Sequence, residues 1–162
     1  MIASLTLTVI ILLSTETTSE SAEVFAYQLG YPDTFSSRNS NILFHMGRLD
    51  DPDYCWAAAS SDLNQWAQIS SMVPQTWIAV ITQGRSHSTH NQWVTHYQVR
   101  YTLNGREWMF VDGGRNFTGN SDQTTWVRNN FTTPVFARAI RIQPTAWSQH
   151  ISMRFDVLFR NI

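Results

Sequence analysis

The chain has 162 residues, of which 43% are apolar and only 14% are charged. This length suits one domain with a single hydrophobic core, and the composition excludes a disordered or fibrous chain. The formal net charge is −1 and all eleven basic residues are arginines, which argues against a nucleic-acid binder, because such proteins carry a marked basic excess.

The first residues differ from the rest of the chain. Residues 2–13 form an uncharged, mostly apolar run, which is followed by the polar stretch 14–21 and by Ala22. The run is too short to span a bilayer, so residues 1–22 are predicted to be a secretory signal peptide and the protein to be secreted. No basic residue precedes the run, and Glu20 lies close to the expected cleavage site. An amphipathic or membrane-held N-terminus therefore remains the alternative.

Residues 23–162 contain no linker, charge block or repeat, which predicts one continuous domain. Cys55 is the single cysteine, so the domain has no internal disulfide, and we interpret this thiol as a packing residue. The sequons that begin at Asn116 and Asn130 become glycosylation sites if the protein follows a eukaryotic secretory route.

The apolar periodicity is that of β-strands. Residues 77–81 are continuously apolar, as in a strand covered on both faces, whereas residues 93–101 alternate large and polar side chains. Asn104-Gly105 then suits the positive φ angles of a tight turn, and residues 107–111 are predicted to return as the partner strand.

Two further strands are predicted near the C-terminus. Residues 135–142 are rich in β-forming side chains, and residues 151–159 alternate as a half-buried strand does. Residues 55–67 come closest to a helical stripe, but their polar centre indicates a turn. The predicted fold class is therefore all-β, an antiparallel β-sandwich of jelly-roll type.

The sequence carries no ordered catalytic motif. It has no nucleophile elbow, no phosphate-cradling glycine loop and no carboxylate pair at helical spacing, so we expect a binding protein rather than an enzyme. His87, His90 and His96 form a weak metal pattern, because this spacing does not fix imidazoles on one face of a strand or loop. We interpret them as solvated loop histidines.

An acidic segment offers oxygen ligands. Asp50, Asp51 and Asp53 could supply oxygens to a Ca²⁺ ion, but Asp-Asp-Pro-Asp is equally ordinary turn chemistry. We expect no required cofactor, with Ca²⁺ binding at these three residues as the alternative.

Three residues at the ends of predicted strands suit a neutral sugar. An aromatic ring packs against the apolar face of a sugar, while fixed donors and acceptors contact its hydroxyls. Trp56 is the predicted stacking platform, Arg85 the hydroxyl donor and Trp93 a second wall. The candidate polar contacts are Asp50, Asp53 and His90. The alternative for each tryptophan is a place in the core.

Ordered motifs run through nearly the whole chain. They are Cys55-Trp56, Asp62-Leu63-Asn64-Gln65-Trp66, Ile81-Thr82-Gln83-Gly84-Arg85, Gln92-Trp93-Val94-Thr95, Asn104-Gly105 with Trp108, Thr118-Gly119-Asn120, Pro134-Val135, Ala137-Arg138-Ala139-Ile140-Arg141-Ile142, Pro144 with Trp147, and His150-Ile151-Ser152-Met153-Arg154. Each is weak alone, but in this order they make the chain resemble the discoidin domain, also called the coagulation-factor type C domain.

This resemblance implies a jelly-roll β-sandwich, similar to galactose-binding domains, whose loops at one end hold the ligand. Members of the family bind galactose-type sugars, anionic phospholipid, collagen or other proteins, and are not enzymes in their own right. Val73-Pro74-Gln75-Thr76 and His150-Ile151-Ser152 look most like the slime-mould discoidin lectins. Ser70-Ser71-Met72 departs from the Asp-Leu-Gly of many members, and the disulfide that joins the ends of many extracellular members is missing.

Without that disulfide, stability must come from the aromatic core. The tryptophans predicted to lie in the core are Trp66, Trp77, Trp108 and Trp147. Three arginines within predicted strands, Arg138, Arg141 and Arg154, are expected to make internal hydrogen bonds rather than to contact a ligand.

The sequence thus predicts a secreted carbohydrate-binding module that recognises galactose or N-acetylgalactosamine and acts in cell adhesion or agglutination. Glycans or glycoproteins are the expected partners, and homo-oligomers would supply several sugar sites on one particle. The alternative is an adhesion module for matrix proteins or phospholipid. The candidate loops at residues 49–54 and 86–91 are polar or acidic, which argues against an anionic membrane.

Overall fold

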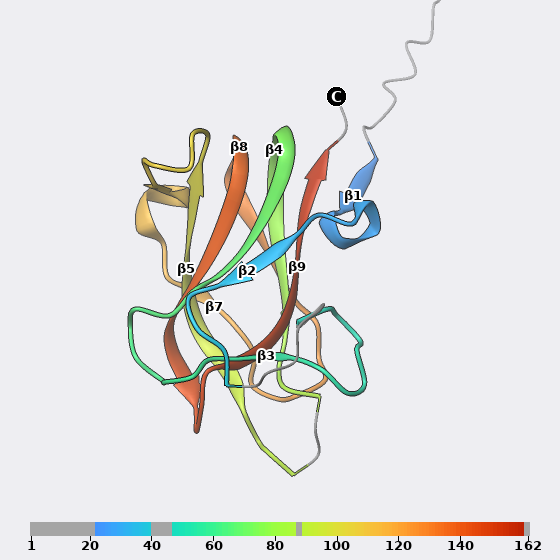
Figure 1. Ribbon diagram of the computed structural model, residues 1–162, viewed down its shortest axis with the longest axis vertical. Helices are drawn as coiled ribbons and strands as arrows, with labels where there is room; N and C mark the ends of the chain where they lie inside the picture. Colours follow the sequence, from blue (N-terminus) through green and yellow to red (C-terminus); the bar gives the residue numbers. More distant parts are fainter. Residues whose placement is uncertain (1–21, 40–46, 87–88, 161–162) are drawn as a thin grey trace, which may run out of the picture.

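The computed structural model describes residues 22–39, 47–86 and 89–160 (Figure 1). The predicted signal peptide, apart from Ala22, and His87 lie outside these residues. Within the described part of the chain, no helix has the length and apolar character needed to cross a membrane.

The described residues form strands and two short 3₁₀ helices, which confirms the all-β prediction. In chain order these elements are β1 (Glu23–Phe25), η1 (Ala26–Leu29), β2 (Asp33–Phe35), β3 (Trp56–Ala57), β4 (Ala67–Gln83), β5 (Trp93–Thr102), β6 (Met109–Phe110), η2 (Val111–Gly114), β7 (Phe117–Thr118), β8 (Val127–Ser148) and β9 (Ser152–Arg160).

The strands pair in the order β1-β9-β4-β8-β5-β6, and β2, β3 and β7 add to β4, β9 and β5. Every pairing is antiparallel. β4 has 17 residues and β8 has 22, and their pairing contains two register shifts. Such irregularities bend strands, and Figure 1 shows that the two long strands curve. The main buried cluster contains side chains of β4, β5, β8 and β9.

Aromatic side chains fill much of this core. The largest rings with no exposed surface are Trp56, Trp77, Tyr97, Phe117, Phe155 and Phe159. Nε1 of Trp77 donates a 2.9 Å hydrogen bond to the carbonyl of Ala137, so the buried indole keeps its polar group satisfied. Aromatic residues bury about 150–250 Å² each, and this burial is the main source of stability that the sequence predicts for a domain without a disulfide.

The tryptophans predicted to be core residues divide into two groups. Trp77 is fully buried, which confirms its prediction, and Trp147 is partly buried against the core. Trp66 and Trp108 are only partly buried, and the guanidinium of Arg141 lies 3.9 and 3.8 Å from their ring centroids. Their assignment to the core is wrong, because both rings hold this cation on the outer side of the sheet.

Strand β9 is buried on both faces, so the prediction of a half-buried strand is wrong. The apolar set beginning at Ile151 faces the main core, as expected. The alternate residues Ser152, Arg154, Asp156 and Leu158 are buried too, because η1, the loops and the side chains of Phe25 and Leu49 cover the other face. Sequence alternation shows polarity, but it does not show what covers a face.

The turn at Asn104-Gly105 is confirmed. Gly105 has φ of +77°, and Oδ1 of Asn104 accepts hydrogen bonds from the amides of Arg106 and Glu107 at 2.9 and 3.0 Å. The predicted return strand is shorter than expected, since only Met109–Phe110 pairs with β5. The chain then turns into η2.

Asp156 of β9 carries a carboxyl group that is buried beneath η1. Its Oδ1 accepts hydrogen bonds from the amides of Val157 and Tyr27 at 2.7 and 3.4 Å. Burial raises the pKa of Asp156 from 3.8 to about 6, although these amides, the amide of Ala26 and the cation of Arg48 act in the opposite direction.

This raised pKa predicts a stability that depends on pH. Between pH 3.8 and about 6 the folded state binds more protons than the unfolded state, so the free energy of unfolding falls as pH rises. Because each pKa unit corresponds to 1.36 kcal/mol, the difference between 3.8 and about 6 lowers the free energy of unfolding by about 3 kcal/mol in total. Urea unfolding at a series of pH values should show a smaller fall for Asp156→Asn than for the wild type.

Asp53→Asn is the control, because the Asp53 side chain is exposed. The role assigned to Asp156 is contradicted if Asp156→Asn and Asp53→Asn follow the same pH dependence as the wild type.

Candidate ligand-binding site at the loop end

Four loops meet at one end of the sandwich, at the bottom of Figure 1. We call this region the loop end; it comprises the described residues of 47–55, 84–92, 119–126 and 148–151. Arg154 of β9, with 5% of its surface exposed, joins three of these loops. Its Nε donates to the carbonyl of Gly84 at 2.9 Å, Nη1 to that of Asp51 at 3.0 Å, and Nη2 to that of Gln123 at 2.7 Å.

These contacts confirm the expectation that Arg154 makes internal hydrogen bonds. Burial lowers the pKa of Arg154, while the nearby Asp50, Cys55 and Asp51 act in the opposite direction. An arginine keeps its charge in proteins, so the three hydrogen bonds are charge-assisted and stronger than neutral ones. The position of each loop is thereby fixed relative to β9.

Gly84 allows two of these loops to touch. A Cβ atom at this residue would lie 2.6 Å from the carbonyl oxygen of Asp122 and 2.8 Å from Cα of Gln123. Only glycine permits this approach of two backbones. The side chain of Gln123 then donates to the carbonyls of Arg85 and His90 at 3.2 and 2.9 Å. Hydrogen bonds therefore connect the loop around Gln123 to the 84–92 loop near its start, at Arg85, and near its end, at His90.

The guanidinium of Arg85 lies at the edge of the loop end. Its Nη1 donates a 2.8 Å hydrogen bond to Oε1 of Gln92, and the same oxygen accepts a 3.0 Å hydrogen bond from the hydroxyl of Ser152. Arg85 and Gln92 are both partly exposed. Trp93 follows Gln92 and is partly buried, with Cβ close to Gly84. The structure thus brings the predicted contacts Arg85, Trp93 and His90 into one region.

Asp50 in the acidic loop forms hydrogen bonds with two residues near the loop end, Gln83 and Trp126. Oδ1 of Asp50 accepts hydrogen bonds from Nε2 of Gln83 and Nε1 of Trp126, both at 2.9 Å. Gln83 also accepts a 2.8 Å hydrogen bond from the amide of Asp50, which has φ of +59°. In the next turn, Oδ1 of Asp51 accepts from the amides of Asp53 and Tyr54 at 2.9 and 2.8 Å.

The three aspartates do not fit a Ca²⁺ site. Oδ1 of Asp50 faces Gln83 and Trp126, whereas that of Asp51 caps its own turn. Among the described residues, no cluster of three or more His, Cys, Asp or Glu side chains is arranged to hold a metal ion. The structure therefore favours the turn interpretation of the Asp-Asp-Pro-Asp segment.

The sequence prediction for Trp56 is wrong. Its ring has no exposed surface and stacks on Phe35, with ring centroids 5.6 Å apart and an interplanar angle of 15°. Nε1 of Trp56 donates to the carbonyl of Ser37 at 2.8 Å. Phe35 of β2 and Ser37 contact this tryptophan, so its buried ring cannot stack on a ligand.

Two aromatic residues at the loop end are exposed, and neither is predicted from the sequence. Tyr54 has 42% of its surface exposed and Trp126 has 45%. Each follows a turn held by an aspartate, Asp51 in one case and Asp122 in the other. An aspartate followed within three or four residues by an aromatic residue is the signal that could have identified them.

The remaining predicted residues have simple surroundings. Cys55 is partly buried, and burial raises the pKa of its thiol, which supports a packing role over a nucleophile.

Asn116 and Asn130 are exposed, with Oδ1 atoms that accept hydrogen bonds from Thr145 and Arg128 at 2.6 and 2.8 Å. Their glycosylation stays a prediction.

Comparison with known sequences identifies relatives of this chain. Residues 33–157 match the family model of the F5/8 type C domain. A discoidin-1 polypeptide of Dictyostelium discoideum is 39% identical over 106 residues, which cover 65% of this chain and 41% of that protein. EGF-like repeat and discoidin I-like domain-containing protein 3 of Mus musculus is 30% identical over 149 residues, or 86% of this chain and 31% of that protein. The chain thus spans less than half of these relatives.

Solved structures share the fold. Recombinant discoidin II of D. discoideum superposes with a TM-score of 0.73 and 27% identity, covering 87% of this chain and 60% of that one. The family 32 carbohydrate-binding module of C. perfringens NanJ, solved in complex with galactose, has a TM-score of 0.62. Its identity is 16%, over 85% of this chain and 99% of that one, so this likeness concerns the fold alone. The predicted jelly-roll sandwich is confirmed.

The contacts of Arg154 predict that its removal destabilises the domain. Arg154→Ala leaves three loop carbonyls without their charged donor, and hydrogen bonds to charged groups contribute about 1.5–3 kcal/mol each. We expect the free energy of unfolding, measured in urea, to fall by at least about 3 kcal/mol. The free energy of unfolding of Arg154→Lys should lie between that of Arg154→Ala and that of the wild type, because one ammonium does not reproduce the arginine fork.

Arg160→Ala is the matched control, since Arg160 is exposed at the last residue of the same strand. An effect of Arg154→Ala no larger than that of Arg160→Ala would show that the three contacts do not hold the loops.

Proposed function

The chain belongs to the F5/8 type C, or discoidin, domain family, and we propose that it is a carbohydrate-binding module whose ligand contacts the loop end. Its relatives include discoidins, and structures of the same fold include a carbohydrate-binding module with bound galactose. The proposed activity is binding rather than catalysis.

The contact between Arg85 and Gln92 carries this proposal. Gln92 fixes the direction of one guanidinium nitrogen, and Ser152 fixes Gln92. A positioned guanidinium is the type of group that donates two hydrogen bonds to adjacent sugar hydroxyls. Because the loop end is already held by Arg154 and Gln123, little conformational entropy would be lost when a ligand binds.

The other roles follow from exposure. Trp93 is the proposed wall of the site, and Asp53 and His90 are the proposed polar contacts beside it. Since Trp56 is buried, the stacking role passes to an exposed ring, either Tyr54 or Trp126. Nε1 of Trp126 is held by Asp50, which orients the indole and gives Asp50 a supporting role.

A galactose or N-acetylgalactosamine terminus is the proposed ligand. The support is the family membership and the galactose-bound module of the same fold. Adhesion or agglutination outside the cell is the proposed setting, which rests on the signal peptide predicted from residues 1–22. Several copies on one particle would give the avidity that such a role needs.

An adhesion module for matrix protein or phospholipid is the second candidate. The exposed rings of Tyr54 and Trp126 favour it, because such rings also serve protein and membrane contacts. The acidic loop opposes an anionic membrane, since Asp50, Asp51 and Asp53 lie on the same end of the domain.

A glycan array tests the sugar site. Wild-type protein should bind galactose-terminated or N-acetylgalactosamine-terminated glycans, and Arg85→Ala should bind them at least about tenfold more weakly, because a charged hydrogen bond contributes about 1.5–3 kcal/mol. Arg160→Ala should bind as the wild type does. The absence of any glycan signal in the wild type would contradict the sugar proposal, and full binding by Arg85→Ala would remove Arg85 from the site.

Liposome sedimentation tests the second candidate. We expect the protein to stay in the supernatant with vesicles of phosphatidylcholine alone and with vesicles that also contain phosphatidylserine. Sedimentation with phosphatidylserine vesicles only, abolished by Tyr54→Ala, would instead favour a membrane function.

A further inference from the structure

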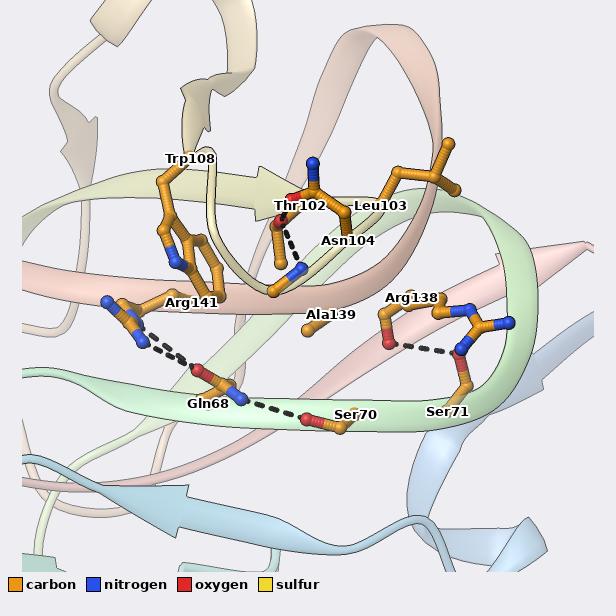
Figure 2. Close-up of a pocket in the computed structure, with 11 residues that line it drawn as sticks. Gln68, Ser70, Ser71, Thr102, Leu103, Asn104, Trp108, Arg138, Ala139 and Arg141 are labelled. Carbon is orange, nitrogen blue, oxygen red and sulfur yellow. Dashed lines mark hydrogen bonds between the residues drawn. The ribbon is translucent and has the colours of Figure 1, made fainter.

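A pocket lies beside the turn that ends β5, whereas Arg85 precedes the start of that strand. It is an open pocket of about 360 Å³ between β4, β8 and the turn at residues 103–107 (Figure 2). β5 has ten residues, and a strand rises about 3.3 Å per residue, so the pocket is about 30 Å from the loop end. None of the residues that the proposed function uses lines this pocket.

Arg141 forms one end of the pocket and is held rigidly. Its guanidinium lies between the rings of Trp66 and Trp108, at 3.9 and 3.8 Å from the two ring centroids. Nε and Nη2 both donate to Oε1 of Gln68, at 3.2 and 2.9 Å. Within the part of the chain that the structure describes, Nη1 has no hydrogen-bond partner, so a fixed cationic donor remains for a ligand.

Arg138 forms the other end, as Figure 2 shows, with Ala139 between the two arginines. In a regular strand, residues three apart point to opposite faces. The pairing of β4 with β8 is irregular between Ser70 and Gln75, opposite this segment, and both arginines line the pocket. Arg138 is exposed, and its guanidinium makes no hydrogen bond or ion pair with any described residue. The expectation that Arg138 makes internal hydrogen bonds is therefore wrong.

The pocket has an excess of positive charge. Arg100 of β5 lies directly opposite Arg141 of β8, and like charges at such positions are destabilising. Burial and the neighbouring Arg100 both lower the pKa of Arg141. The pocket lining includes no carboxylate, and neither Arg138 nor Arg141 lies within 4 Å of one among the described residues. Arg138 and Arg141 thus lie at opposite ends of the pocket without a carboxylate partner among the described residues, and an anion would compensate the charge at either end.

The size of the pocket argues for more than a small ion. Its volume lies within the range of about 300–1,000 Å³ for small-molecule sites. Groups that form hydrogen bonds with hydroxyls line it between the arginines, among them Gln68, Ser70 and Asn104. The lining thus combines two cations, polar side chains that can form hydrogen bonds with sugar hydroxyls, and the indole of Trp108.

We propose that this pocket is a second glycan site, which binds an acidic saccharide with its sulfate or carboxylate at the guanidinium of Arg138 and the rest of the saccharide extending toward Arg141. Both groups are oxyanions that match the guanidinium fork. The saccharide hydroxyls contact Ser70, Asn104 and the amide of Gln68. A single domain would then bind a neutral sugar at the loop end and an acidic sugar about 30 Å away.

Binding of N-acetylglucosamine 6-sulfate, measured by isothermal titration calorimetry, tests this proposal. This probe lacks galactose and therefore reports on the second site. Wild-type protein should bind it more tightly than unsulfated N-acetylglucosamine, and its affinity should fall as sodium chloride is added. Arg138→Ala should weaken binding about tenfold, as expected for one charged hydrogen bond. Arg106→Ala is the matched control, because it removes an exposed arginine of the same turn that does not line the pocket.

Arg85→Ala separates the two sites. It should leave binding of the sulfated sugar unchanged while it weakens binding of galactose, and Arg138→Ala should show the reverse. The proposal is overturned if sulfated and unsulfated probes bind equally, or if Arg138→Ala and Arg106→Ala have the same effect. Inorganic sulfate that binds as tightly as the sulfated sugar would show a site for a free anion. Stronger binding to phosphatidylserine vesicles, lost in Arg138→Ala, would show a membrane contact; either result overturns the saccharide proposal.

Discussion

The hydrogen bonds of Arg154 are the constraint on which the loop end depends. One guanidinium donates to the carbonyls of Gly84, Asp51 and Gln123, which belong to three loops that are distant in sequence. Such a fork needs the planar geometry of arginine, and lysine does not provide it. Because Arg154 lies in β9, which is buried on both faces, the rigid core of the sandwich sets the positions of the loops. The placement of Arg85 beside Gln92 then follows from the same framework, through Gln123.

Much of the fold was predictable because local chemistry determines it. The alternation in residues 151–159 identifies β9, and Asn104-Gly105 identifies the turn after β5, since both depend on residues that are neighbours in the chain. The burial of the second face of β9 was not predictable, because the loops that cover Arg154 come from elsewhere in the sequence. The tryptophans show the same limit, because composition does not tell which indoles lie in the core. Trp56 is buried there, whereas Trp66 and Trp108 contact the guanidinium of Arg141. At the site, Arg85 and Trp93 were predicted from their positions at the ends of strands, whereas the indole of Trp126 is held by Asp50, 76 residues away, which no local pattern reveals.

The two ends of β5 differ in charge, and the proposed ligands differ accordingly. The loop end carries Asp50, Asp51 and Asp53 with Arg85, whereas the pocket at the other end carries Arg138 and Arg141 without a carboxylate in its lining. One end therefore suits neutral hydroxyls, and the other suits an oxyanion. Two separated sites of different chemistry on one rigid sandwich would allow a domain to engage two glycans, which strengthens weak individual contacts.

The framework held by Arg154 is proposed to present Arg85 to a neutral sugar at the loop end. A crystal structure of the protein with a galactose-terminated disaccharide tests this claim most directly. We expect electron density for the sugar at the loop end, with a hydroxyl within hydrogen-bonding distance of the Arg85 guanidinium and an aromatic ring against the sugar face. Density for the galactose in the Arg138 and Arg141 pocket alone, or a sugar at the loop end that does not contact Arg85, would contradict it.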